Sequence, residues 1–368
     1  MQMITIPPSS MRRAASAALL ALLALMLSAC GSSSEVAATG GAQASPAADE
    51  APISTTGASP AIYVAETLRP SVVDVSVADA QGQAQGLGSG VIYLTSGVIV
   101  TNNHVVTAGG NQPAPNITVT LATGERLDAS LVGRDPLSDL AVLRVDKEDL
   151  PAATFLTDMS QVQVGEYAFA LGTPLGLEGS VTMGIVSAIN REVPGGGSLG
   201  TLDLIQTDAA ISPGNSGGAL ADARARVIGI NVAAASPDIE TRAQNIGFAI
   251  PSDLVVDVVE QILETGKVDY GYLGIQATTI TESLEQDYGL SRSEGVLVVQ
   301  VESDSPAAKA GVRQGDIIIQ IGDRVVDSEV DLFSYLRGQK PGEQVELVIV
   351  RDGEERTLTA TLGSRPSS

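Results

Sequence analysis

The sequence is short of the residues that most often build disulfides and metal sites. Its 368 residues include one Cys, one His and no Trp, and aromatic residues make up only 3%. One Cys cannot form a disulfide within the chain, and one Cys with one His cannot supply the ligands of a zinc site. We therefore expect no metal and no cofactor, and any reaction that uses an imidazole must use His104.

Basic residues are scarce as well. Lys and Arg number 21 against 43 Asp and Glu, so the formal net charge is −22. A nucleic-acid-binding protein needs a positive surface for the phosphates, and no basic cluster stands out here, so the composition argues against one. Apolar residues reach 44%, which is enough for sizeable cores, and the length favours about two domains.

The first 29 residues predict a lipoprotein signal peptide. Arg12 and Arg13 precede an apolar run that is too short to span a membrane, and the run ends in Leu-Ser-Ala before Cys30. This ending resembles a bacterial lipobox, in which the cysteine is lipidated and becomes the mature N-terminus. The alternative is an ordinary signal peptide with a chance cysteine. Residues 30–60, rich in Ala, Ser, Gly, Thr and Pro, predict a disordered tether.

Residues 61–266 predict a domain made of many short strands. Apolar alternation or apolar runs indicate strands at 90–94, 98–100, 117–121, 140–145 and 181–189. Strands this short and frequent are typical of barrels or sandwiches. The first convincing helix comes only at 252–265, with apolar residues at helical spacing, and it ends at Gly266, where we place the domain boundary.

Residues 267–368 predict a second domain of mixed α and β type. A Ser-Pro start and a glycine end predict a short helix within 305–311. The sequence Ser-Glu-Val-Asp at 328–331 is typical of a capped helix start. Farther on, Asp352-Gly353 between two apolar-polar runs predicts a hairpin with a type I′ turn.

The sharpest motif is Gly214-Asn215-Ser216-Gly217-Gly218. Flanking glycines expose a serine Oγ and let nearby N–H groups converge on one point, as a nucleophile and an oxyanion hole require. The motif alone also fits the nucleophile elbow of α/β-hydrolases, but in that fold the histidine follows the serine. Here His104 precedes Ser216, so the order with an intervening aspartate is that of chymotrypsin.

The aspartate of such a triad must be buried beside the histidine. Asp139 is our first choice, because it opens the apolar strand 140–145, which would carry it into the core. Asp135 is the second choice. The alternative for Asp139 is that it only caps a turn after Pro136.

Together these motifs resemble the HtrA/Deg family of trypsin-like serine proteases. The resemblance covers residues 61–363 and rests on the segments 101–104, 135–136, 139–143, 171–174, 184–187, 206–210, 214–218 and 247–251. It implies an all-β, double-barrel, chymotrypsin-like protease domain followed by an α+β PDZ domain. It also implies that Ser216 is the nucleophile, His104 the general base and Asp139 its orienting partner. The N–H groups of Gly214 and Ser216 would form the oxyanion hole.

The family resemblance carries further expectations. Members are usually homotrimers that act in protein quality control outside the cytoplasm. It thus implies a homotrimer that degrades or processes unfolded envelope proteins. From the lipobox-like ending we expect it to be held to a bacterial envelope membrane, in the periplasm or at the cell surface, by lipid on Cys30. One PDZ domain rather than two favours a tethered protease over a large chaperone cage. Ser212 and Ala219 depart from the usual Asn and Pro, which puts loop geometry in doubt but not the reaction.

The second domain carries a candidate peptide site. Tyr272-Leu273-Gly274-Ile275 resembles the carboxylate-binding loop of a PDZ domain, and the strand after it would pair with a peptide C-terminus. We expect Leu332 and Tyr335 on the following helix to line the groove. The alternative is that Leu273 and Ile275 are only core residues.

The specificity pocket is predicted to be apolar. Basic-specific relatives place an acid six residues before the serine, whereas here that position is Ala210, followed by Ile211. An unpaired buried cation is costly, so we expect a small or medium aliphatic residue such as Val, Ala or Leu at the cleaved position. Two other functions stay open: a non-proteolytic peptide-binding or chaperone protein, and an esterase with the same triad.

Overall fold

The computed structural model describes residues 59–108, 110–173, 179–191, 202–232 and 245–364. The predicted signal peptide, Cys30 and all of the tether except its last two residues lie outside these ranges. Within them, no helix combines the length and the apolar character that crossing a membrane would require.

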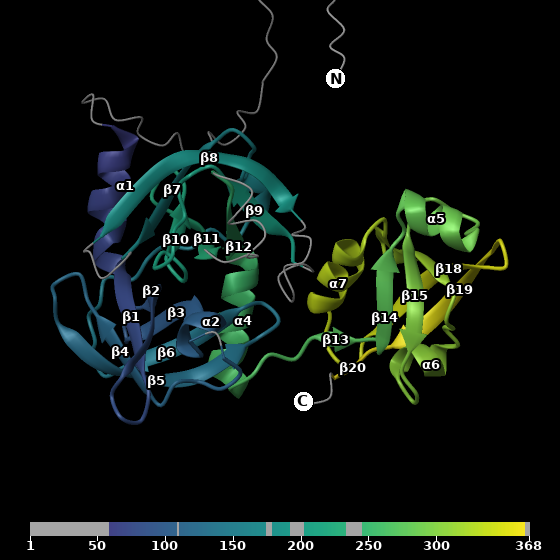
Figure 1. Cartoon of the computed structure of the whole chain (residues 1–368), viewed down its shortest axis with the longest axis horizontal. Helices are drawn as coiled ribbons and strands as arrows, with labels where there is room; N and C mark the ends of the chain where they lie inside the picture. Colours follow the sequence, from purple (N-terminus) through teal and green to yellow (C-terminus); the bar gives the residue numbers. More distant parts are fainter. Residues whose placement is uncertain (1–58, 109, 174–178, 192–201, 233–244, 365–368) are drawn as a thin grey trace, which may run out of the picture. The chain divides into compact units, whose positions relative to one another are not determined.

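Twelve antiparallel strands of the described chain close into two six-stranded barrels, as Figure 1 shows. The first barrel has the order β1-β2-β3-β6-β5-β4, with bounds β1 Val72–Ala78, β2 Ala84–Leu94, β3 Val98–Asn102, β4 Asn116–Thr120, β5 Arg126–Asp135 and β6 Leu140–Val145. The second has the order β10-β11-β12-β9-β8-β7, with bounds β7 Tyr167–Gly172, β8 Ser180–Arg191, β9 Leu204–Thr207, β10 Ala219–Ala221, β11 Val227–Val232 and β12 Gly247–Pro251. The predicted double-barrel, all-β architecture is confirmed.

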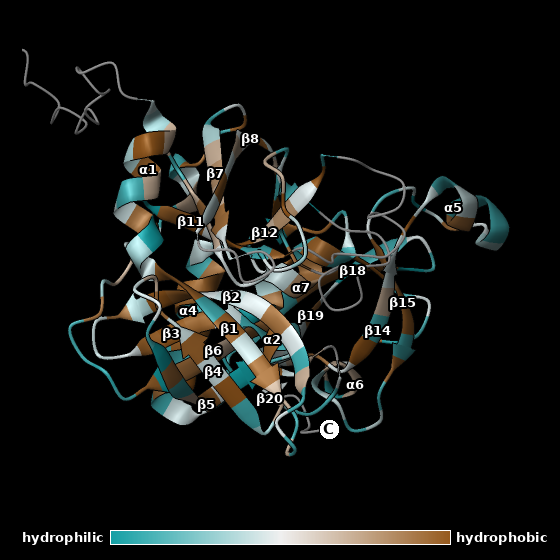
Figure 2. Cartoon of the chain, turned by 60° about the vertical axis from the view of Figure 1, so that its left-hand side comes forward, coloured by the Kyte–Doolittle hydropathy of each residue, from teal (hydrophilic) through white to brown (hydrophobic). Residues whose placement is uncertain are grey.

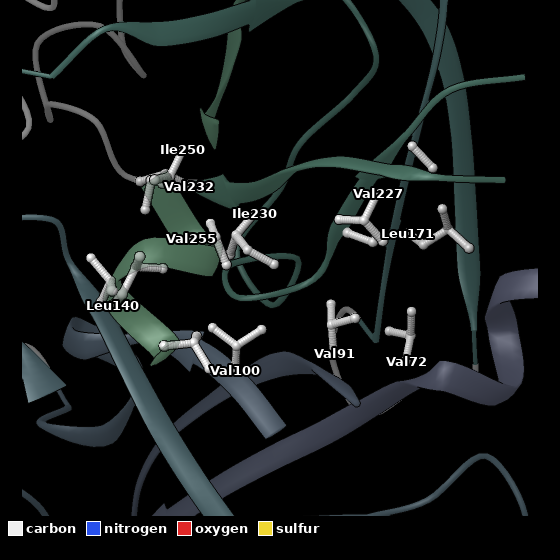
Figure 3. Close-up of a cluster of buried hydrophobic side chains, with 14 of the residues drawn as sticks. Val72, Val91, Val100, Leu140, Leu171, Val227, Ile230, Val232, Ile250 and Val255 are labelled. Atoms are coloured by element: carbon white, nitrogen blue, oxygen red, sulfur yellow. The ribbon is translucent and has the colours of Figure 1, made fainter. Parts of the chain in front are cut away.

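The largest apolar cluster lies between the two barrels (Figure 3). It draws Val91 and Val100 from the first barrel and Leu171 and Ile230 from the second. Their chain neighbours point the other way: Ile92, for example, belongs to the separate core inside the first barrel. Because successive side chains of a strand face opposite sides, strands such as β2 and β3 contribute both to the core inside their own barrel and to the cluster between the barrels.

Helices of this domain lie at its ends and in its connections. α4, Ser252–Thr265, was predicted with these bounds, and it ends at Gly266 in the left-handed conformation, with φ of 78°. The expectation that no convincing helix precedes it was wrong, because α1 spans Pro60–Leu68. Ser59 caps α1, and the helix buries only Val64 and Leu68. Such a narrow apolar stripe next to an Ala- and Ser-rich segment gives a weak periodic signal.

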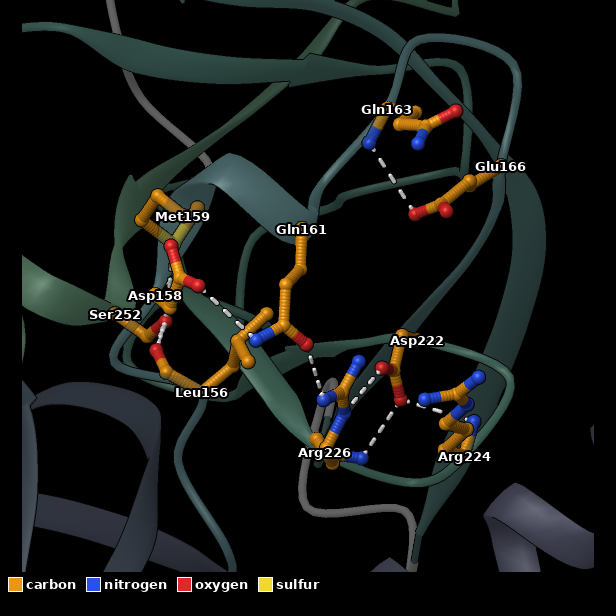
Figure 4. A network of polar contacts seen from close by, with 10 residues as sticks. All are labelled: Leu156, Asp158, Met159, Gln161, Gln163, Glu166, Asp222, Arg224, Arg226 and Ser252. Atoms are coloured by element: carbon orange, nitrogen blue, oxygen red, sulfur yellow. Dashed lines mark hydrogen bonds and ion pairs between the residues drawn. The ribbon is translucent and has the colours of Figure 1, made fainter. Parts of the chain in front are cut away.

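Three shorter helical turns lie in the described part of the first domain: η1 Arg69–Ser71, α2 Asn103–Val106 and η2 Met159–Gln161. A polar network ties η2 to the β10–β11 hairpin that follows the Ser216 loop (Figure 4). Arg226 donates to Asp222 at 2.7 Å and to Gln161 at 2.9 Å. Asp222 also accepts the backbone N–H of Arg224 and of Arg226, each at 2.9 Å. The network therefore anchors the turn of the hairpin to η2.

The second domain is of α+β type, as predicted. Its main sheet has the order β14-β15-β16-β18-β19, with β17 beside β16, and a small sheet pairs β13 with β20. The strands are β13 Gly271–Tyr272, β14 Ile275–Thr279, β15 Val296–Val301, β16 Ile317–Ile321, β17 Arg324–Val325, β18 Gln344–Arg351, β19 Glu354–Thr361 and β20 Gly363–Ser364. The helices are α5 Glu282–Tyr288, α6 Pro306–Ala310 and α7 Glu329–Arg337. Figure 2 shows α5 as mostly hydrophilic and the central strands as hydrophobic.

The local signals read from this part of the sequence are confirmed. Ser328 and Asp331 form a reciprocal capping box at the start of α7. Ser305 caps α6, which has proline in its first turn and ends at Gly311. Asp352 and Gly353 both have positive φ, as a type I′ turn requires.

Candidate active site

His104 lies on the single turn of α2, directly after strand β3 of the first barrel. Its ring Nδ1 is 2.7 Å from Oδ2 of Asp139, and its backbone N–H donates to Oδ1 of the same carboxylate at 2.9 Å. A carboxylate only accepts, so Nδ1 carries the proton and Nε2 keeps its lone pair. The Asp139 side chain is 9% exposed and that of His104 33%. The carboxylate is therefore largely buried, whereas the imidazole remains partly exposed to solvent.

Asp139 reaches this position through an unusual backbone conformation. Its φ is 56°, in the left-handed region that Asp tolerates better than most residues. Its carbonyl accepts the backbone N–H of Asn103 at 2.9 Å and the side-chain amide of Asn102 at 3.0 Å. Both ends of Asp139 therefore bind the segment that carries His104. Asn102 thus helps to hold Asp139 in place, a role that the sequence motifs did not predict.

Asp135, the second choice, performs the capping role that was the alternative for Asp139. Its carboxylate accepts the N–H of Leu137 at 3.1 Å and of Ser138 at 2.9 Å, and the hydroxyl of Tyr270 at 2.6 Å. Burial, with the negative charge of Asp135, raises the pKa of Tyr270 well above its ordinary value, so its hydroxyl stays a donor. Asp135 shapes the turn, and Asp139 faces the histidine.

The Ser216 loop packs against the first barrel. The Ser216 carbonyl accepts the N–H of Ser89 at 2.7 Å, and a Cβ on Gly217 would collide with Ser89 and Thr101. Thr101 lies three residues before His104 on the same segment. The structure thus holds the serine loop against the strand that leads to the histidine. Gly217 also has a positive φ of 83°, so only glycine fits there easily.

The predicted oxyanion loop has a defined turn. Asn215 N–H donates to the Ser212 carbonyl at 2.9 Å, and Gly214 has a φ of 99°. The Gly214 carbonyl accepts the Ser89 hydroxyl at 2.6 Å. Ser89 also accepts the N–H of Thr173 at 2.9 Å, and so it joins both barrels at this loop. Sequence reasoning missed Ser89, although its Gly-Ser-Gly context at 88–90 was visible.

Comparisons with known proteins point the same way. Residues 88–230 match the trypsin-like peptidase domain and residues 271–362 match the PDZ domain. The chain is 36% identical to the solved structure of the HtrA-type protease AlgW with decapeptide, with a TM-score of 0.69, covering 84% of this chain and 99% of that one. The chain belongs to the HtrA/Deg family of trypsin-like serine proteases.

Other HtrA/Deg proteins extend this comparison. A serine endoprotease structure from Yersinia pestis is 32% identical, with a TM-score of 0.63, over 83% of this chain and 98% of that one. Probable periplasmic serine endoproteases described as DegP-like, from Ectopseudomonas mendocina and Halomonas elongata, are each 40% identical over 78% of this chain. This chain spans 58% and 59% of the length of these two curated relatives.

The two positions that depart from the usual HtrA/Deg pattern fit this loop. Ser212 contributes its carbonyl to the turn, a role that any residue can fill. Ala219 begins strand β10 and is fully buried.

Of the two residues predicted to set specificity, Ile211 lies beside β12. Ala210 is exposed, and its carbonyl accepts the hydroxyl of Thr182 at 2.8 Å. A Cβ on Gly247 would be 2.8 Å from Cδ1 of Ile211, so the Ile211 side chain lies over the start of β12. Both side chains are apolar, and their place in a specificity pocket stays a prediction. Residues 233–244 lie outside the described ranges.

The PDZ loop has the backbone that carboxylate capture needs. Gly274 has a φ of 76°, and a Cβ there would collide with Ser305. The carbonyls of Leu273 and Gly274 are both occupied, by the N–H groups of Ala307 and Glu302 at 2.9 Å each. Their carbonyls are thus turned into the domain. Tyr272 donates its hydroxyl to Glu302.

The groove assignment needs one correction. Leu332 was expected to line the groove, but it is 0% exposed and belongs to the PDZ core. It shares a helix face with Leu336, and that face covers the sheet. Leu273 is likewise a core residue, while Ile275 is partly exposed. The hydroxyl end of the Tyr335 ring lies against Gly322, which follows β16. That Tyr335 lines the groove stays a prediction.

The described residues contain no group of three or more His, Cys, Asp or Glu placed to hold a metal ion. What they do include is an imidazole oriented by Asp139 and a glycine-flanked serine whose loop packs against the strand leading to His104. Those are the parts that acyl transfer by a serine needs.

Proposed function

We propose that this chain is an extracytoplasmic serine endopeptidase that cleaves unfolded or misfolded envelope proteins. The observation that carries the proposal is the double contact of the Asp139 carboxylate with His104, through ring Nδ1 and backbone N–H. It fixes both the tautomer and the direction of the imidazole. The family membership and the names of the relatives, which are described as periplasmic serine endoproteases, support the same reaction and location.

The reaction runs in two acyl-transfer steps. His104 Nε2 takes the proton of Ser216 Oγ as the oxygen attacks the peptide carbonyl, and Asp139 stabilises the imidazolium that forms. The N–H groups of Gly214 and Ser216 stabilise the negative oxygen of the tetrahedral intermediate. His104 then gives its proton to the leaving amine. Water, activated by the same imidazole, hydrolyses the acyl-enzyme and frees Ser216.

Active-site labelling tests this proposal directly. A fluorophosphonate should modify Ser216 and no other serine, as peptide mapping would show, and Ser216→Ala should abolish casein digestion. Ser212→Ala is the matched control, because Ser212 contributes only its backbone carbonyl to the same loop. Undiminished digestion by Ser216→Ala, or labelling elsewhere, would contradict the proposal.

The two alternative functions give different results in the same assays. A chaperone or peptide-binding protein would suppress aggregation of an unfolded substrate equally well with Ser216 or Ala at that position, and would leave casein intact. An esterase would turn over a simple ester and leave the matching peptide uncleaved. If the chain is an endopeptidase, it should cleave the peptide. Ser216→Ala should then lose both the peptide and the ester activity.

The PDZ domain is proposed to bind peptide C-termini and to change protease activity when it does so. The support is the Tyr272-Leu273-Gly274-Ile275 loop followed by β14, which is an edge strand paired only with β15. A bound peptide would add a strand to this edge while loop N–H groups hold its carboxylate. Equal affinity for free and amidated C-termini in calorimetry would rule out carboxylate capture.

Assembly and attachment belong to the same proposal. We propose a homotrimer, held to an envelope membrane by lipid on Cys30. Tyr167 and Ile185 lie opposite each other on β7 and β8, with Met183 next on that face, and they are 54%, 37% and 54% exposed. An apolar surface of this kind supports association with another protein surface. Light scattering should give three times the mass of one chain.

A further inference from the structure

The open edge of β14 is closed at one end by the side chain of Glu329. This residue is the first of α7, and its Oε2 accepts the backbone N–H of Thr279 at 3.2 Å. In return, the Glu329 backbone N–H donates to Thr279 Oγ1 at 3.0 Å. Thr279 is the last residue of β14. We call this reciprocal pair the Thr279–Glu329 clasp.

The clasp uses a group that a bound peptide would otherwise need. The N–H of Ile280 points to the β15 side, where it donates to the Gly295 carbonyl at 3.0 Å. Successive N–H groups of a strand alternate, so those of Thr279, Ala277 and Ile275 point to the open edge. These three residues are the positions at which an added strand would pair. At Thr279 the N–H already has a partner.

We propose that the Thr279–Glu329 clasp limits the PDZ site to the last three residues of a peptide. This inference rests on the carboxylate capture proposed above and adds the length of the ligand. With the carboxylate at the 272–275 loop, the C-terminal residue lies beside Ile275 and the third residue from the end beside Ala277. The fifth residue from the end would lie beside Thr279, whose N–H is taken. Because this N–H is taken, we expect a longer peptide to gain little over its last three residues.

Calorimetry on the full chain with peptides of two lengths tests the clasp. The probes are Ala-Leu-Val and Thr-Ser-Ala-Leu-Val, each with a free and an amidated C-terminus. The unaltered protein should bind both free peptides within about twofold of each other. Glu329→Ala frees the Thr279 N–H, so the pentapeptide should then bind about five- to tenfold more tightly than the tripeptide, the effect of one hydrogen bond.

Two further variants separate the clasp from a general effect on the helix. Glu329→Gln keeps a side-chain oxygen that can accept the Thr279 N–H, and it should restore the equal affinities. Glu282→Ala is the matched control, because Glu282 is also the first residue of a capped helix in this domain but lies on α5. It should leave the length dependence unchanged.

Hydrogen exchange of the full chain provides a readout that needs no peptide. The segment 275–281 should exchange faster in Glu329→Ala than in the unaltered protein, because the Thr279 N–H loses its acceptor. Unchanged exchange, or a pentapeptide preference already present in the unaltered protein, would overturn the clasp. Failure of carboxylate capture looks different: free and amidated peptides would behave alike while the exchange difference remained.

Discussion

Single residues decide the chemistry of this protease, and Asp139 shows how. Its left-handed backbone turns the carboxylate back onto the start of α2, where it meets two N–H groups of His104. Its carbonyl meanwhile binds the two residues before the histidine. One residue therefore positions the whole 102–104 segment. Asp135, four residues earlier, uses the same functional group only to hold the turn.

We expect Asp139→Asn to lower kcat/KM by about 10⁴-fold at neutral pH, the effect of this exchange in a serine-protease triad. An amide presents only one acceptor oxygen, so it cannot accept both N–H groups of His104. Peptide hydrolysis by the purified variant measures the loss, and thermal unfolding should be little changed. A variant that keeps more than a tenth of the activity would exclude Asp139 from the triad.

Asp135→Asn is the comparison for that experiment. It puts an amide donor either opposite the Leu137 N–H, which now donates to Oδ1, or opposite the Ser138 N–H and the Tyr270 hydroxyl, which both donate to Oδ2. Leaving buried polar groups unpaired costs about 1–3 kcal/mol. We therefore expect a lower midpoint of unfolding with a smaller loss of activity, the reverse of the Asp139→Asn result.

Substrate choice is the second property set by single residues. Mass-spectrometric mapping of casein fragments should show cleavage mainly after Val, Ala or Leu, because Ala210 and Ile211 offer no charge to pair with a cation. Ile211→Ala should shift the preference to larger apolar residues, since the Ile211 side chain lies over β12. Ile189→Ala, an exposed residue of β8, is the control. A digest dominated by Lys or Arg would contradict the apolar pocket.

At the scale of elements, the helices end by two different geometries. Gly311 follows α6 with a φ of 87°, in the left-handed region, whereas Gly338 follows α7 with a φ of −75°, in the right-handed region. Both belong to the PDZ domain. A Cβ at Gly311 would meet nothing within 4 Å, and one at Gly338 only the Tyr335 carbonyl at 3.5 Å. The two glycine positions therefore differ in backbone conformation rather than in the space available for a side chain.

Substituting alanine at each glycine tests this difference. Gly311→Ala should lower the free energy of unfolding of the PDZ domain by about 1 kcal/mol, because a side chain disfavours the left-handed conformation. Gly338→Ala should be neutral or stabilise it by about 0.5 kcal/mol, because alanine restricts the unfolded chain. Urea unfolding of the full chain measures both. Equal effects of the two substitutions would show that φ is not the deciding factor.

At the scale of the whole molecule, the scarcity of histidine makes the pH profile easy to read. The chain has one histidine, and histidine is the side chain whose charge ordinarily changes between pH 5 and 8. The base must be neutral to accept the Ser216 proton. Log(kcat/KM) should therefore fall on acidification with a slope of about one. Light scattering at each pH excludes dissociation of the oligomer. A slope near two, or no fall down to pH ~5, would contradict a sole imidazole base.

Membrane attachment is also a property of the whole chain. Cys30→Ser should move the protein from the membrane fraction to the soluble fraction of the cell envelope, because lipid on this residue is the proposed anchor. Two or three acyl chains hold a protein stably where one does not. Activity of the released protein on casein should be retained. Unchanged membrane association of the variant would mean that the anchor lies elsewhere.

Features that depend on neighbours along the chain could be predicted from the sequence. The capped start of α7 at Ser328, the end of α4 at Gly266 and the Asp352-Gly353 turn follow from local backbone preferences, and all were predicted. The order of His104, Asp139 and Ser216 likewise identified the fold, since each fold with this chemistry has its own order. Helix α1 was missed because it is stabilised mainly by the burial of Val64 and Leu68 against the barrels.

The sharing of polar groups between distant segments depends on tertiary packing and could not be predicted from the sequence. Asp135 and Asp139 are the same residue type on one short turn, and their roles differ because Tyr270 meets one and His104 meets the other. Ser89 supports the oxyanion loop from 125 residues away, and Leu332 is core rather than groove because its helix face covers the sheet. Such contacts depend on the packing of whole strands and helices, which no local pattern encodes.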